Sequence, residues 1–271
     1  MCILFFALKQ HPKYPVIICA NRDEFHQRPT KAMLWWLTPK ILAGKDLTAG
    51  GTWLGLTEHG RFSALTNFRQ AEQFNHNKKS RGDLVIRALK QTNKNITTFL
   101  HNSVDDYNGY NLIYGQLNDL YYFDSVNKNS RQLPTGIHSL SNGALDDSWP
   151  KMALGQQQLS ALINKSSTNL DTQDHTLDIE QLFHLMKNTQ QAKNEQLPIT
   201  GVSQQWEKFL SAIFIVSPEY GTRTTTIITQ DINGEIFIAD RSYNALGEIN
   251  LDQQFNINTK EYNESHHQKP L

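Results

Sequence analysis

The 271-residue sequence has only two cysteines, no excess of either charge and no long hydrophobic run. Cys2 and Cys19 alone give no disulfide framework, so we expect a cytoplasmic protein with reduced thiols. The 26 basic side chains are matched by 26 acidic ones, which argues against a nucleic-acid partner. The longest apolar run, residues 3–8, is too short to span a bilayer, and no charged segment of a signal peptide precedes it.

The ten histidines and two cysteines form no metal-binding motif. The sequence contains neither HExxH nor CxxC, and we therefore expect no metal site and no required cofactor. A haem iron needs only one or two axial side chains, so haem stays open as a ligand. Nothing in the sequence indicates the oligomeric state.

The order of predicted elements favours an α+β fold. Short apolar runs predict strands, and apolar residues three and four apart predict helices. Strands are expected over 2–8, 15–20, 110–116, 120–125, 211–217, 222–229 and 235–240, with two more inside 49–69; helices are expected within 80–91, 96–100, 150–162 and 179–187. Strands thus alternate with pairs of helices, which is typical of antiparallel sheets covered by helices. We expect one domain over 1–250 and a polar tail over 251–271.

The first two strands predict a site at the start of the chain. A hairpin loop centred near residues 11–12 places Cys2 across from Asn21 or Arg22. Cysteine at position 2 is small enough to permit removal of the initiator Met1, which would leave a free α-amine beside the thiol. The amine and the thiol have ordinary pKa values of about 8 and 8.5, so one can accept the proton of the other. The alternative is that Cys2 is a small buried hydrophobic residue.

Several motifs occur in a fixed order along residues 1–245. They are CANRDE, AGGTWLGL, ALTNFR, SRGDLV, GIHSLSNGALDDSWPK and YGTRTTT. In this order the motifs resemble the NRDE family, also called the transport and Golgi organisation protein 2 family. The resemblance implies an N-terminal-nucleophile (Ntn) hydrolase fold, a four-layer αββα sandwich of antiparallel sheets. Arg81 in SRGDLV is expected to be a structural residue near a helix start.

A more distant similarity to choloylglycine hydrolases and penicillin V acylases implies roles for individual residues. Cys2 corresponds to the nucleophile, Arg22 to an arginine at the end of the second strand, and Arg223 to an arginine in a late strand. Two asparagines correspond to the oxyanion donors. The carboxylate of those enzymes would fall near Phe25, where this chain offers Asp23 or Glu24 instead. The implied catalytic set is Cys2, Arg22, Asp23, Asn67, Asn142 and Arg223, with Asn21, Glu24, Trp53 and His138 as substrate-binding residues.

Two functions fit these residues. The first is a hydrolase in which Cys2 attacks the amide or thioester carbonyl of a small acyl compound. The second is a non-catalytic protein that binds or carries haem, or handles lipids or acyl-CoA, in the same pocket. The family is associated with haem mobilisation and lipid metabolism, and the five tryptophans and the arginines suit a flat anionic ligand.

Overall fold

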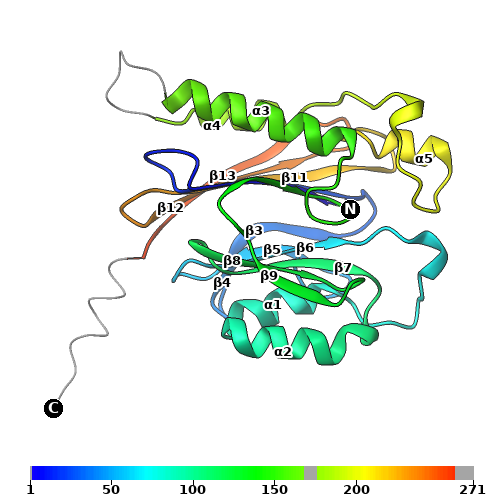
Figure 1. The fold of residues 1–271 in the computed structure, drawn as a ribbon, viewed down its shortest axis with the longest axis horizontal. Coiled ribbons are helices and arrows are strands. Elements are labelled where there is room, and N and C mark those ends of the chain that lie inside the picture. Colours follow the sequence, from blue (N-terminus) through cyan, green and yellow to red (C-terminus); the bar gives the residue numbers. More distant parts are fainter. Residues whose placement is uncertain (1, 168–175, 260–271) are drawn as a thin grey trace.

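The computed structural model describes residues 2–167 and 176–259, which form two antiparallel sheets stacked face to face (Figure 1). Helices cover the outer face of each sheet, so the layers run helix, sheet, sheet, helix. The predicted α+β class and the four-layer αββα sandwich are therefore confirmed. Among the described residues, no helix combines the length and the apolar character needed to cross a membrane.

The first sheet has six strands in the order β10-β1-β2-β11-β12-β13. Their bounds are β1 Cys2–Leu8, β2 Val16–Phe25, β10 Gly136–Leu140, β11 Tyr220–Gln230, β12 Glu235–Tyr243 and β13 Ile249–Asn258. Strands β1 and β2 are interior strands, and their apolar runs are buried on both faces. This explains why both read as continuous hydrophobic segments rather than as alternating patterns.

The second sheet has seven strands, each paired with its neighbours in the sequence. Its strands are β3 Thr30–Trp36, β4 Ile41–Asp46, β5 Leu54–Leu56, β6 Arg61–Asn67, β7 Tyr110–Gln116, β8 Asp119–Asp124 and β9 Asn129–Gln132. Helices α1 (Gly82–Lys90) and α2 (Asn93–Ser103) cover its outer face. The apolar face of α1, with Leu84 and Leu89, joins the core formed against this sheet.

Alternation along β1 divides the core between the two faces of the first sheet. Leu4 and Phe6 enter the core between the sheets, where they join Phe62 of β6. Ile3 and Phe5 point to the other side, toward α3 (Pro150–Ser167) and α4 (Ile179–Met186). A side chain on Gly155 would overlap the Phe5 ring, so glycine permits the close approach of α3 to the sheet.

One predicted strand is absent. Residues 211–217 follow helix α5 (Gln204–Phe209) as an irregular segment, although their apolar side chains are mostly buried. The backbone groups of this segment make hydrogen bonds to side chains instead of pairing with a neighbouring strand. The Asn21 side chain donates to the carbonyl of Ile213, and Ile215 N–H donates to Thr222 Oγ1. The remaining short helices are 3₁₀ turns at Ala71–Gln73, Val104–Asp106 and Asn194–Gln196.

The first sheet continues past residue 250, where a polar tail is expected from the sequence. Strand β13 extends to Asn258 and pairs with β12 along its whole length. It is an edge strand with mostly exposed side chains, so the period-two hydrophobic pattern that marks a strand is missing from it. Residues 260–271 of the expected tail lie outside the described residues.

Candidate functional site

Cys2 begins β1 and lies directly opposite Arg22 on β2, as the hairpin geometry predicts. Both residues are only 7% exposed. On its other side β1 pairs with β10, and just beyond that strand Ser141 Oγ donates a hydrogen bond to the Cys2 carbonyl at 3.0 Å. The first residue of the strand is therefore held by backbone and side-chain contacts from both neighbours.

A cavity of about 530 Å³ opens beside this pair and takes its walls from both sheets. It brings together seven of the ten residues predicted for the site. These are Cys2, Arg22, Asp23, Glu24, Trp53, Asn67 and Arg223. The loop that precedes α1 closes another side of the cavity with residues 74–76 and 78–81, and Gly82, the first residue of α1, also lines it.

Asn21, a predicted substrate-binding residue, does not line the cavity. Because Arg22 shares the face of Cys2, strand alternation turns Asn21 to the helix-covered face. There Nδ2 donates to the carbonyls of Met186 and Ile213, and Oδ1 accepts a hydrogen bond from Thr225. All of these partners are protein groups, which gives Asn21 a structural role.

His138 and Asn142 also lie outside the cavity lining. His138 is opposite Phe6 on β1, four residues along the strand from Cys2, and its Nδ1 lies 2.7 Å from Asp146 Oδ2. Asn142 is adjacent to the cavity, because its Nδ2 donates to the backbone carbonyl of Asn67 at 2.9 Å. Asn142 therefore positions Asn67, and His138 belongs to a separate ion pair.

The Cys2 thiol lies in an environment that disfavours the thiolate. Burial raises its pKa to about 11, and the nearby Asp23 raises it as well, while the charge of Arg22 opposes this rise. The thiol is therefore protonated at neutral pH. A reaction at this sulfur needs a base that removes the proton.

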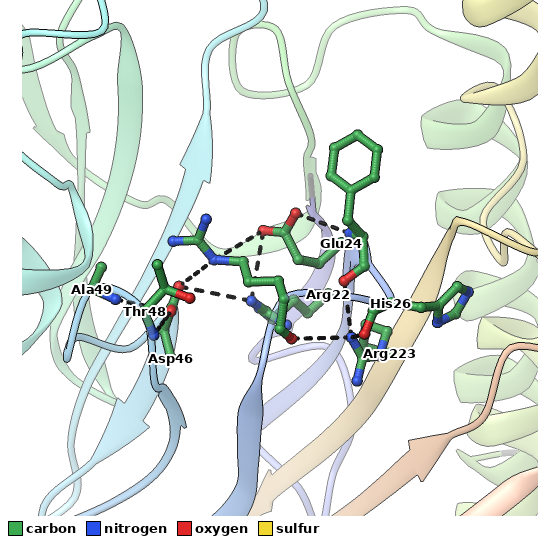
Figure 2. A network of polar contacts seen from close by, with 9 residues as sticks. Arg22, Glu24, His26, Asp46, Thr48, Ala49 and Arg223 are labelled. Carbon is green, nitrogen blue, oxygen red and sulfur yellow. Dashed lines mark hydrogen bonds and ion pairs between the residues drawn. The ribbon is translucent and has the colours of Figure 1, made fainter.

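Arg22 is fixed by a network of charges, which Figure 2 shows. Its Nη2 lies 3.6 Å from Glu24 Oε2 and 4.0 Å from Asp46 Oδ2. Arg28 Nε donates to the same Asp46 oxygen at 2.7 Å. Although burial opposes it, this hydrogen bond lowers the pKa of Asp46, so the carboxylate stays charged. Asp46 and Arg28 lie outside the matched motifs, and no sequence pattern indicates their part in the site.

Arg223 reaches the cavity from a bulge in β11, where the register shifts between Thr222 and Thr224. Its Nη1 donates to the carbonyls of Phe25 and His26 at 3.0 and 3.2 Å (Figure 2). These acceptors are neutral, so the guanidinium keeps its charge on the cavity wall. The structure thus brings Arg223 to the same cavity as Arg22.

Asp23 is almost completely buried and accepts a hydrogen bond from Thr222 Oγ1 at 2.6 Å. Burial raises the pKa of its carboxyl group, and the charge of Lys151 opposes that effect. Lys151 is itself 4% exposed, and burial lowers its pKa to about 8. Lys151 lies about one helical turn before the buried Gly155 and about two turns before the buried Leu159. Residues at this spacing share one face of a helix, so the sequence spacing alone could have indicated that Lys151 is buried.

Arg81 is a cavity residue, although the sequence predicts only a structural role for it. Its Nη1 donates to the carbonyl of Gly109 at 2.9 Å, and burial lowers its pKa to about 10, while the nearby Cys2 and Glu24 oppose that shift. The motif SRGDLV marks this segment without indicating that it faces Cys2.

Across residues 2–167 and 176–259, no three His, Cys, Asp or Glu side chains gather as a metal site requires.

A family model described as "Transport and Golgi organisation 2" matches residues 1–245. The Transport and Golgi organization 2 homolog of Mus musculus is 31% identical over 265 residues, covering 89% of this chain and 93% of that protein. Transport and Golgi organization protein 2 of Drosophila melanogaster is 25% identical over 272 residues, covering 91% and 93%.

Among solved structures, a mutant of the conjugated bile acid hydrolase from Clostridium perfringens is similar with a TM-score of 0.50. The sequence identity is 10%, and the match covers 96% of this chain and 93% of that structure. At this identity the likeness shows the fold alone. It supports the Ntn-hydrolase-like arrangement of the two sheets.

Proposed function

The chain belongs to the Transport and Golgi organisation 2 family, and from this premise we propose that it is an N-terminal-nucleophile cysteine hydrolase. Its substrate would be a small acyl compound with an amide or thioester bond. The observation that carries the proposal is the pairing of Cys2 with Arg22 at a cavity that also contains Asn67 and Arg223.

The first step is transfer of the thiol proton. Removal of Met1 makes the α-amine of Cys2 available as the base, which the buried, protonated thiol requires. The thiolate then attacks the substrate carbonyl, and the guanidinium of Arg22 stabilises the negative charge on sulfur. The α-ammonium group returns the proton to the departing amine or thiol, and water hydrolyses the resulting acyl-enzyme thioester.

Asn67 is the better candidate for binding the oxyanion. Asn142 Nδ2 already donates to the Asn67 backbone carbonyl, whereas no hydrogen bond engages the Asn67 side chain within the described part of the chain. An amide donor aimed at a developing oxyanion typically contributes roughly 3 kcal/mol to the transition state. Asn142 supports this donor by holding the backbone that carries it.

Two measurements test the proposal. Mass spectrometry of the intact mature protein should show that Met1 has been removed. A thiol-directed acyl probe should label the wild-type protein and the Cys19→Ala variant but leave the Cys2→Ala variant unlabelled. Cys19 is the matched control because it is a fully buried thiol on the helix-covered face of the same sheet. A retained Met1, or equal labelling of all three proteins, contradicts the proposal.

A second candidate function is binding or transport of haem without turnover. The specific observation is that Trp53, Met33 and His76 line the cavity together with arginines. An imidazole can serve as an axial ligand of haem iron, and arginines can bind the propionates. Titration with haem should then give a saturable Soret shift that the His76→Ala variant loses, while Cys2→Ala keeps it. No saturable shift would count against this function.

A further inference from the structure

A second groove, of about 430 Å³, lies where the ends of β2 and β11 meet helix α5. Figure 1 shows α5 at the right-hand end of the helix layer that covers the first sheet. The groove shares no lining residue with the cavity beside Cys2. Four aromatic side chains line it: Phe25 from β2, Trp206 and Phe209 from α5, and Tyr220 from β11. The proposed hydrolase chemistry uses none of them.

The four rings stand at steep angles to one another. Phe25 and Tyr220 are direct partners across β2 and β11, and their ring centres are 5.0 Å apart with the planes at 78°. The Trp206 ring lies 6.0 Å from Tyr220 at 82° and 5.4 Å from Phe209 at 85°. In the described part of the chain no ring contact joins Phe25 to Trp206, so each packs on Tyr220 separately. Perpendicular rings turn their faces in different directions, and a ligand between Phe25 and Trp206 meets several rings at once.

Two of the rings leave large surfaces open to solvent. Phe25 is 50% exposed and Trp206 is 42% exposed, whereas Tyr220 is only 4% exposed and forms the floor of the groove. Covering apolar surface is favourable, and clustered exposed apolar side chains mark binding sites. The aromatic walls are therefore available to a ligand without any rearrangement of the core.

Glu219 supplies the charge in the lining of the groove. Its side chain is exposed, and it forms no ion pair with the described residues. The buried Arg69, whose charge acts on Tyr220, is already balanced by Glu207 at 3.0 Å. The groove thus combines aromatic rings with one uncompensated negative charge, which is complementary to a cation that has an apolar surface.

We propose that this groove binds a quaternary ammonium group, placed between Phe25 and Trp206 above Tyr220, with Glu219 at its edge. Aromatic faces attract cations through the ring quadrupole, and several rings around one site are typical of quaternary ammonium recognition. A lysine ammonium is strongly hydrated and has three donors to satisfy. A quaternary ammonium has no N–H, so it loses no hydrogen bond when aromatic rings surround it.

The test is a ligand-observed NMR titration with choline at low ionic strength. Choline should bind saturably, and its neutral isostere 3,3-dimethyl-1-butanol should bind about tenfold more weakly, because it has the shape without the charge. Trp206→Leu should weaken choline binding about tenfold, and Glu219→Gln about threefold, with the latter effect reduced by salt. The matched control is Trp35→Leu, which removes a tryptophan of 36% exposure on β3 outside the groove and should change the affinity less than about twofold.

Phosphatidylcholine vesicles distinguish two sources of the group. Cosedimentation that Trp206→Leu abolishes assigns it to a lipid headgroup, and choline binding without cosedimentation assigns it to a free small molecule. The Cys2→Ala protein should bind choline as tightly as the wild type, so the result does not depend on the hydrolase function.

Four results would overturn the proposal: no saturable choline binding, equal affinity for the neutral isostere, equal weakening by Trp206→Leu and Trp35→Leu, or weaker binding by Cys2→Ala. The last result would move the ligand to the cavity beside Cys2. Glu219→Gln keeps the test decisive if Trp206→Leu does not fold, because this exposed side chain changes its charge and almost nothing of its shape. An unchanged affinity and salt dependence in that variant would also refute the role of the carboxylate.

Discussion

Replacing Glu207 by alanine should destabilise the fold strongly, because it leaves a buried arginine without its counter-ion. Arg69 follows β6 and is 8% exposed, and Glu207 on α5 is 3% exposed. Arg69 Nη1 lies 3.0 Å from Glu207 Oε2, and the Arg69 guanidinium stacks 4.9 Å from the centre of the Trp149 ring. Glu207 Oε1 also accepts hydrogen bonds from the backbone N–H and the hydroxyl of Thr200.

Loss of one partner from a buried ion pair costs roughly 3–5 kcal/mol, because the remaining charge stays desolvated. For a chain of this size, a loss of about 3 kcal/mol lowers Tm by roughly 6–12 °C. The paired replacement Arg69→Met with Glu207→Leu should cost less than Glu207→Ala alone, since it leaves no unpaired charge.

The assay is urea unfolding followed by tryptophan fluorescence, with Tm from calorimetry as a second measure. Glu219→Ala is the control, because Glu219 is an exposed acid with no ion pair among the described residues. Its free energy of unfolding should change by less than about 0.5 kcal/mol. If Glu207→Ala behaves like this control, the Arg69–Glu207 ion pair does not stabilise the packing of α5 against the segment after β6, and the prediction is wrong.

Three further predictions concern other parts of the molecule. The hydrogen bond that the His138 ring donates to the Asp146 carboxylate raises the pKa of His138, so Asp146→Asn should lower that pKa in an NMR titration. The stability that the pair contributes should be greatest below about pH 6.5 and should vanish as the pH rises through the pKa of His138 in the folded protein. Gly155→Ala should lower the free energy of unfolding by about 1–3 kcal/mol, seen as a lower urea midpoint, because the added methyl overlaps the Phe5 ring. A higher midpoint would mean that the better helix propensity of alanine outweighs this overlap. In protein that retains Met1, the rate of Cys2 alkylation by iodoacetamide should rise about tenfold per pH unit from pH 7 to 10, since burial raises the thiol pKa to about 11; a plateau near pH 8.5 would contradict that pKa.

The arrangement around Cys2 could be predicted from sequence because it depends on short-range geometry. The loop between β1 and β2 is short, so counting outward from it places Cys2 opposite Arg22. The order of the motifs indicates the family, and the resemblance to that family implies the four-layer sandwich. Asn67 and Arg223 came from the same motifs, and both line the cavity.

The rest of the site depends on contacts that local sequence does not determine. Which of Asn21 and Arg22 faces the cavity is a matter of register, and a shift of one residue exchanges them. Asp46 and Arg81 reach Arg22 and Cys2 from the second sheet and its loop, through tertiary packing alone. The segment 211–217 misled the strand prediction because buried apolar residues look alike whether their backbone pairs in a sheet or in loops.

The pairing of β2 with β11 also constrains when the cavity beside Cys2 can form. The Asn21 side chain meets Thr225 across a sequence separation of 204 residues, and β11 contributes Arg223 to the cavity. Contacts this distant form late and slow the folding of a chain. During synthesis Cys2 would leave the ribosome long before β11, so the cavity wall could not form until β11 has also been made. The cavity beside Cys2 therefore depends on β11, and a truncation before β11 should yield a protein that lacks Arg223 and leaves one edge of β2 unpaired.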